Sequence, residues 1–257
     1  MKSCYLINRG NNKSLFISAY GDYSSSRGWD ENEDVCIYSG TTVTKDQKDF
    51  SLYTLYTDID RGVDRWIQDV RYLPKLLIGG AIFLVTYFFF SLAVRDPIPV
   101  LDETIIALIV TTISVVALSR RDKKSDISLK KRFELKQRAS ESRYEIAPEL
   151  NLIEQYLYDC AQFDTIELSE KIAKVEGKNL PPLSLEISND YMIPFKEQYL
   201  TYIKLNQKEI YSLYNRYLNV VKTKKGREAF SARLLKLGMN SLTDLPLLAT
   251  TIMIANQ

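Results

Sequence analysis

The chain has 257 residues, a formal net charge of +2 and no histidine. Without histidine it lacks the commonest general base and the commonest metal ligand, and its three cysteines, Cys4, Cys36 and Cys160, lie too far apart for metal-binding spacing. No glycine-rich nucleotide-binding motif and no nucleophile-elbow sequence is present. We therefore expect no enzymatic activity, no bound metal and no cofactor.

Residues 1–45 are expected to form a small cytosolic β unit. The apolar runs CYLI and SLFISAY are separated by NRGNNK, which is rich in turn-forming residues, and a polar loop leads to a third run, VCIYSG. Three short strands alone make a marginal sheet. We therefore expect this unit to pack on the helical part of the chain.

Residues 46–75 are predicted to form an amphipathic helix that leads to a membrane. Thr44 and Gln47 have the spacing of a capping box, and Pro74 is expected to kink the helix near its end. Apolar residues recur at alternating intervals of three and four, as in heptads. We call this line the juxtamembrane seam: Leu52, Tyr56, Ile59, Val63, Trp66, Val70 and Leu73. It predicts helix pairing, either within the chain's own cytosolic part or between chains.

Residues 76–119 contain two uncharged apolar runs, Leu76–Val94 and Thr104–Ser119. A spanning helix needs about 20 apolar residues; the first run has that length, and residues 98–101 extend the second. A buried helical pair in a soluble core is the alternative. The run FLVTYFFFSLAV has no polar face at helical spacing, which favours a transmembrane hairpin.

The charges that flank the hairpin predict its orientation. Four basic residues precede it, at positions 61, 65, 71 and 75, and a dense basic stretch follows it, whereas the loop of residues 95–103 has one basic and three acidic residues. Lys and Arg favour the cytoplasmic side. We therefore expect two spans, with both termini cytoplasmic.

Small and hydroxyl-bearing residues in the spans predict close helix packing. Such residues let helix backbones approach, and here they are Gly79, Gly80, Ala107, Thr111 and Ser114. Asp102 and Glu103 begin the second span. In an assembled pore they would form an acidic ring at the outer mouth, and as single residues they would complement the helix dipole.

Residues 120–146 are predicted to continue as one basic exit helix. Its cations are expected to contact anionic lipid, as a collar formed by Arg120, Arg121, Lys123, Lys124, Lys130, Lys131 and Arg132. Ile127 and Phe133 are expected to pack on the juxtamembrane seam. Direct nucleic-acid binding is the alternative, which the lack of interleaved aromatic residues disfavours.

Residues 147–257 are expected to form a helical cytosolic domain. The chain as a whole is thus predicted to be mainly α, with a two-span transmembrane hairpin between a small β unit and this domain. A tyrosine-rich stripe, which includes Tyr199, Tyr214 and Tyr217, is interpreted as core lining with hydroxyls at its edge. A helix capped by Asp244 is expected to end the chain.

The layout of residues 46–146 resembles that of two-transmembrane effectors of bacterial antiphage systems, including SLATT-type and retron-associated transmembrane proteins. The resemblance lies in the order of a juxtamembrane helix, a tight hairpin and a basic exit helix, and it assigns no functional residue. It implies a homo-oligomer in a bacterial inner membrane that disrupts the bilayer when a regulatory protein or ribonucleoprotein partner releases it. A membrane-tethered scaffold that binds a partner is the alternative.

Overall fold

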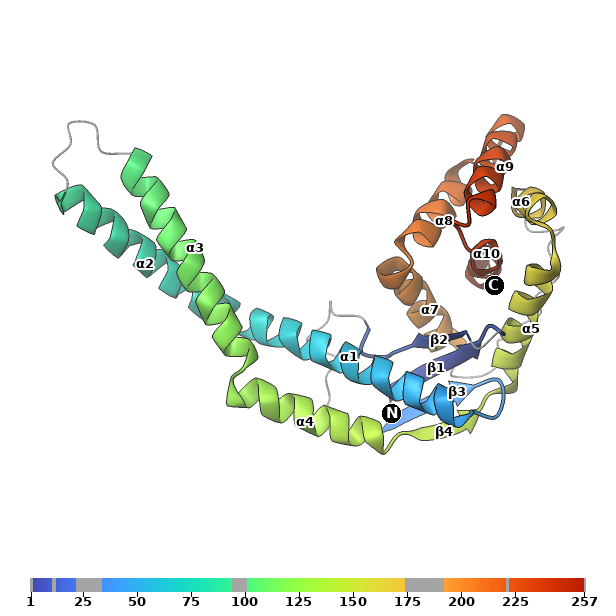
Figure 1. Ribbon diagram of the computed structural model, residues 1–257, viewed down its shortest axis with the longest axis horizontal. Coiled ribbons are helices and arrows are strands. Elements are labelled where there is room, and N and C mark those ends of the chain that lie inside the picture. The colour runs from blue at the N-terminus through green and yellow to red at the C-terminus, as the bar shows by residue number, and fades with distance from the viewer. Residues whose placement is uncertain are drawn as a thin grey trace. The chain divides into compact units, whose positions relative to one another are not determined.

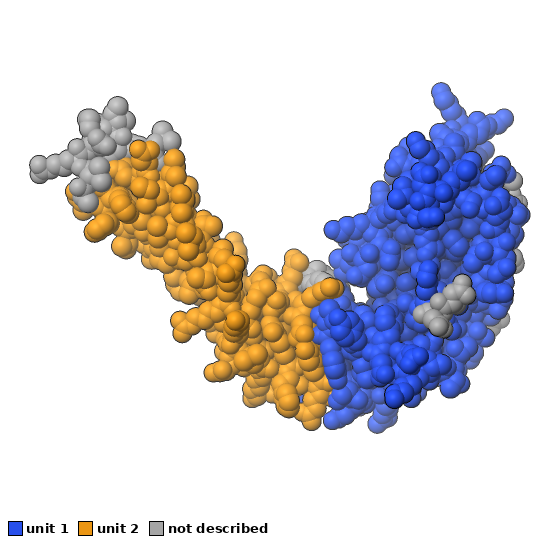
Figure 2. All heavy atoms as spheres, in the orientation of Figure 1, with its two compact units in different colours: residues 1–22, 32–58, 138–257 blue, residues 23–31, 59–137 orange. Residues whose placement is uncertain are grey.

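The computed structural model describes residues 2–10, 13–21, 34–93, 101–173, 192–220 and 222–256. This part of the chain is mainly helical, with ten helices and one four-stranded sheet (Figure 1), which confirms the predicted fold class at that level. The chain divides into two compact units, coloured separately in Figure 2. Unit 1 comprises residues 1–22, 32–58 and 138–257, and unit 2 comprises residues 23–31 and 59–137.

The sheet of unit 1 contains a strand that the sequence did not reveal. Its spatial order is β2-β1-β3-β4, in which β1 pairs antiparallel with β2 and parallel with β3, and β3 pairs parallel with β4. The strands are β1 (Lys2–Asn8), β2 (Ser14–Ile17), β3 (Val35–Ser39) and β4 (Arg143–Ile146). Because β4 lies in the segment predicted as the exit helix, residues 1–45 do not form a separate β unit.

Six whole helices follow β4 in unit 1. The sequence of residues 195–224 predicts one long helix, but the helix is interrupted at Gln207, where the side chain of Asn206 donates to the Tyr202 carbonyl (3.2 Å). The helices are α5 (Pro148–Gln162), α6 (Thr165–Ala173), α7 (Met192–Asn206), α8 (Lys208–Val220), α9 (Lys224–Met239) and α10 (Leu245–Asn256). Asp244 caps α10 as predicted, since its Oδ1 accepts from Leu247 N–H (3.1 Å).

The core of unit 1 lies around α10 and the inner face of the sheet. The rings of Tyr5 and Phe195 meet edge to face at 4.9 Å, and the hydroxyl of Tyr199 lies 3.1 Å from that of Thr251. Tyr199 and Tyr217 are buried, so the tyrosine stripe does line the core. The sequence also predicts a helix end at Gly177 and an extended segment at residues 181–188. Both lie outside the described residues, as do Val94 and loop residues 95–100.

Glu154 on α5 is a buried carboxylate that accepts a hydrogen bond from the backbone N–H of Asn8 at 2.8 Å. Burial raises the pKa of Glu154 above its usual range, and that hydrogen bond only partly opposes the shift. The folded chain thus holds this proton more tightly than the unfolded chain does. Its stabilising contribution is present at low pH and is lost as pH rises through the folded pKa.

Glu154→Gln should therefore raise the melting temperature at pH 7, because the amide oxygen keeps the Asn8 hydrogen bond without a buried charge. The gain should shrink as the pH approaches 4. Thermal unfolding across this range measures it, with the exposed Glu228→Gln as matched control. A gain that grows toward pH 4 would contradict the sign of the pKa shift.

Unit 2 consists of the second half of α1 (Lys45–Val70), α2 (Tyr72–Ala93), α3 (Leu101–Lys123) and most of α4 (Asp126–Ser140). The capping box that starts α1 is confirmed: Gln47 Oε1 accepts from Thr44 N–H (3.0 Å) and Thr44 Oγ1 from Gln47 N–H (3.4 Å). Both α2 and α3 are long and apolar enough to cross a membrane.

Two breaks interrupt the helices of unit 2: the first lies near Pro74, where the sequence predicts a kink, and the second lies where none was predicted. The chain turns at Arg71, three residues before Pro74, because proline has no N–H to donate to the carbonyl of Val70 one turn earlier. The basic exit segment is not one helix either. It breaks at residues 124–125, where the Ser125 hydroxyl donates to the Asp122 carbonyl (2.7 Å), and α4 begins after the turn.

Candidate functional site

The helices α2 and α3 lie in close contact at Gly79. A Cβ atom at Gly79 would lie 3.1 Å from Cγ2 of Val115 and 3.6 Å from Cγ2 of Thr111, and Ala107 is fully buried. Small residues thus let the two helices approach, as in membrane helix pairs. Gly80 was also predicted to pack between the helices, but it does not, because a Cβ atom there would meet nothing within 4 Å. Ser114 is half-buried, and the hydroxyl oxygen of Thr111 has no partner among the described residues.

Gly79→Leu is expected to destabilise the hairpin by about 1–3 kcal/mol, because its side chain would overpack the contact with Val115. Gly80→Leu is the matched control in the next position. It should leave the free energy of unfolding nearly unchanged, since its side chain enters open space. Unfolding of both variants in mild detergent measures the difference. Equal stabilities would mean that α2 and α3 do not meet at Gly79.

A buried carboxylate joins the start of α2, around residues 71–75, to the end of α3, around residues 119–123. The side chain of Asp122 is 8% exposed and accepts from Arg71 and from Lys75, whose Nζ lies 3.1 Å away. The Lys75 side chain is itself only 11% exposed. We call Arg71, Lys75 and Asp122 the neck triad.

Further ion pairs join α1 to the segment that leaves α3. Asp64 binds Lys123 (2.8 Å) and Arg132, and Asp60 binds Lys136 (2.7 Å). The ammonium group of Lys131 lies over the ring of Trp66, 5.4 Å from its centroid. Lys123, Lys131 and Arg132 therefore contact α1, which corrects their assignment to a lipid-facing collar. Arg120, Arg121, Lys124 and Lys130 are exposed.

The buried face of α1 is shifted from the predicted juxtamembrane seam. Its residues recur every four positions and are at most 1% exposed: Leu55, Ile59, Val63 and Ile67. Only Ile59 and Val63 belong to the seam. Leu52, Tyr56 and Trp66 are half-buried, and Val70 and Leu73 are 55% and 62% exposed.

The inner face of α4 is also different from the predicted one. Ser128, Leu135 and Ala139 are buried, while Ile127 and Phe133, which were expected to pack on the seam, are 55% and 70% exposed. The physical reason is the ion pairing of Arg132 and Lys136 with Asp60 and Asp64, which turns that side of α4 toward α1 and the two large apolar residues outward.

The two acids at the start of α3 have different environments. Asp102 is exposed, whereas Glu103 is 5% exposed and its Oε2 has no hydrogen-bond partner among the described residues. An acidic ring at the outer mouth of a pore needs exposed side chains. Of the two acids, only Asp102 meets that requirement.

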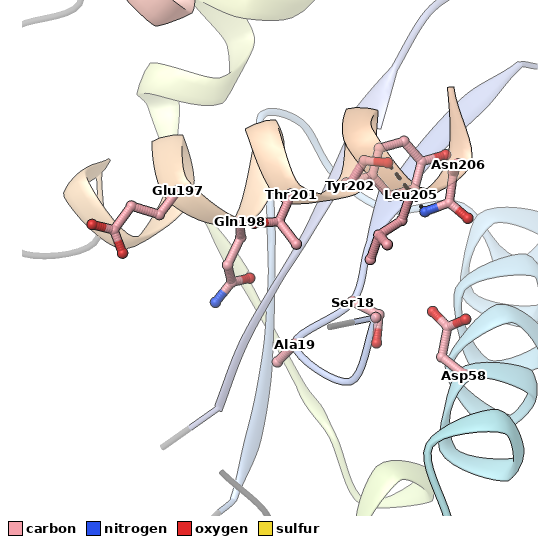
Figure 3. A pocket seen from close by; sticks show the side chains of 10 residues that line it. Ser18, Ala19, Asp58, Glu197, Gln198, Thr201, Tyr202, Leu205 and Asn206 are labelled. Carbon is pink, nitrogen blue, oxygen red and sulfur yellow. Dashed lines mark hydrogen bonds between the residues drawn. The ribbon is translucent and has the colours of Figure 1, made fainter. Parts of the chain in front are cut away.

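Unit 1 contains a polar cavity of about 170 Å³ that sequence reasoning missed (Figure 3). Asp58 reaches it from α1, Ser18 from the turn after β2, and Gln198, Thr201 and Tyr202 from α7. Gln198 Oε1 is buried with no partner among the described residues. Burial, reinforced by the negative charge of Asp58, raises the pKa of Tyr202, so its phenol stays protonated. No sequence motif links residues so far apart along the chain.

The chemistry available in the described residues is limited. Burial raises the pKa of Cys4 to about 12 and that of Cys160 to about 11, so neither thiol forms a nucleophilic thiolate at neutral pH. Among the residues that the structure describes, no three His, Cys, Asp or Glu side chains gather to hold a metal ion. Comparison with protein-family models, with curated proteins and with solved structures finds no match.

Proposed function

We propose that this protein is a bacterial inner-membrane effector, of the antiphage or abortive-infection kind, that assembles and disrupts the bilayer when its cytosolic part is triggered. The observation that carries the proposal is the exposure of the paired helices α2 and α3. Only 6% of the apolar stretch of α2 and 11% of that of α3 are buried, so neither is a core helix of the described chain. Apolar surface of this extent requires a covering, which lipid provides.

The topology follows from charge. The neck triad and the exposed cations Arg120, Arg121 and Lys124 lie at the start of α2 and the end of α3. The connecting loop of residues 95–103 has three acidic residues and one basic residue. The positive-inside rule then directs both termini to the cytoplasm.

A reporter fused after Gln257 should accordingly be active only when it is of a cytoplasmic type, such as a fluorescent protein that fails to mature in the periplasm. Alkaline phosphatase at the same position should be inactive, and inserted near residue 98 it should be active. The reverse pattern would overturn the topology and the function that depends on it.

Two spans cannot enclose a water path, so disruption requires several copies. Ala107 is buried inside the hairpin and is therefore not available to a second copy. Copies would have to meet through the outward faces of α2 and α3, where Leu84, Val85 and Ile113 are exposed. The ion pairs from Asp60 and Asp64 connect α1 to the segment after α3. A displacement of α1, whose first half belongs to unit 1, would thereby act on the spans.

Induced expression in a bacterium without other components of the system tests the proposal. We expect growth arrest and loss of membrane potential, measured with a voltage-sensitive dye. The control is Leu84→Arg with Val85→Arg, which places two charges in the centre of α2, each at an insertion cost of about 2.5–3.5 kcal/mol, and should be harmless. If the wild-type chain inserts but leaves growth and potential unchanged, the protein is a membrane-tethered scaffold instead.

A further inference from the structure

An amphipathic groove of about 640 Å³ runs along one side of the hairpin, entirely within unit 2. One end is apolar and is lined mainly by Leu76, Phe83, Leu108 and Val115. The other end is polar and is lined by Gln68, Tyr72, Lys75 and Ser119. A ligand that fits such a groove has an apolar body and a polar head.

Glycine creates the apolar part of the groove. Gly79 and Gly80 both line it, and Gly80 has no atom within 4 Å of the position that a Cβ would occupy. From Leu76 to Phe83 the apolar part of the groove follows α2 for about 10 Å at the helical rise per residue. This length is about two thirds of the depth of one lipid leaflet, which is half of a hydrocarbon core about 30 Å thick.

The polar end carries an excess of positive charge. Lys75 and the neighbouring Arg71 both bind the carboxylate of Asp122, so the neck triad as a group carries a net charge of +1 beside the groove. Tyr72, Gln68 and Ser119 add neutral hydrogen-bonding groups there. Basic pockets beside membrane helices on the cytoplasmic side are suited to anionic lipid head groups.

We infer that this groove binds one phospholipid with an anionic head group. The inference rests on the proposed membrane insertion. The phosphate lies at the polar end beside Lys75, and an acyl chain lies over Gly79 and Gly80. Bound there, the lipid fills the space between α2 and α3 and makes hairpin stability depend on lipid charge.

The test uses the full chain purified in neutral detergent, with palmitoyl-oleoyl phosphatidylglycerol as the anionic probe and the matched phosphatidylcholine as the zwitterionic one. Native mass spectrometry counts bound lipids, and thermal unfolding reports their effect. We expect one retained phosphatidylglycerol, at least tenfold tighter than phosphatidylcholine, and a higher melting temperature with the anionic lipid.

Gly80→Leu fills the groove without an internal clash and should weaken phosphatidylglycerol binding at least tenfold. Ala81→Leu adds the same side chain at the next, exposed position, which does not line the groove, and should bind like the wild type. Equal binding of both lipids would overturn the charge selectivity, and unchanged binding by Gly80→Leu would overturn the groove as the site.

Two other outcomes would contradict the lipid site or the membrane insertion. If Gly80→Leu converts an oligomer to a monomer in light scattering, without losing a lipid, a second copy of the chain occupies the groove and the inference fails. Extraction of the wild-type chain from membranes by carbonate would instead refute insertion and the proposed function. A chain that inserts but retains no lipid contradicts only the lipid site.

Discussion

Asp122→Asn should destabilise the hairpin by about 3–5 kcal/mol, the cost of removing one partner from a buried ion pair. Asparagine leaves Lys75, whose side chain is 11% exposed, without a nearby negative charge, and it weakens the hold on Arg71. Loss of this carboxylate should separate the start of α2 from the end of α3. Thermal or denaturant unfolding in mild detergent measures the change, together with protease sensitivity between residues 71 and 123.

Asp126→Asn is the matched control, because Asp126 is exposed in the first turn of α4 and there complements only the helix dipole. It should cost about 0.3–1 kcal/mol. A double variant, Asp122→Asn with Lys75→Met, should recover much of the lost stability, since it removes the unpaired buried charge along with its partner. Equal effects of the two single variants would show that water screens the neck triad.

Val63→Asp is the second change with a large expected effect. Val63 is completely buried on the face of α1 that meets α4, and an unpaired carboxylate there should cost several kcal/mol. We expect low yield of folded protein and rapid proteolysis of α4. Trypsin digestion of detergent-solubilised protein, compared with the wild type, gives the measurement.

Tyr53→Asp places the same charge on the same helix at a side chain that is 74% exposed, and it should change stability by less than about 0.5 kcal/mol. If Val63→Asp were equally mild, the face of Leu55, Ile59, Val63 and Ile67 would not be packed. A loss of oligomers with the monomer still folded would show instead that this face joins different chains.

Local features of the sequence predicted much of the helical structure. The capping residues Thr44 and Asp244 mark helix starts because they bond to backbone groups within three residues, so no distant partner is needed. The two uncharged runs likewise predicted α2 and α3, since helix length and apolar composition are properties of the segment alone.

Which face of each helix is buried depends on the segments that pack against it. The heptad spacing of α1 identified Ile59 and Val63, but the full buried face also contains Leu55 and Ile67. It lies beside Asp60 and Asp64, which form ion pairs with α4. The predicted seam and the observed buried face are two sets of apolar residues that both recur about every 3.6 positions on the same helix. Periodicity alone therefore does not show which set is buried.

Composition and local pattern by themselves determined the apolar helical pair, the basic flanks and the absence of a recognisable catalytic motif. Only the tertiary structure decided that residues 143–146 form a strand, that Asp122 is buried between two cations, and that Asp58 meets α7 at a polar cavity. The reason is physical: a strand at a sheet edge, a buried ion pair and a cavity wall each need groups far apart in the chain. Their energies arise from those contacts and from the exclusion of water around them.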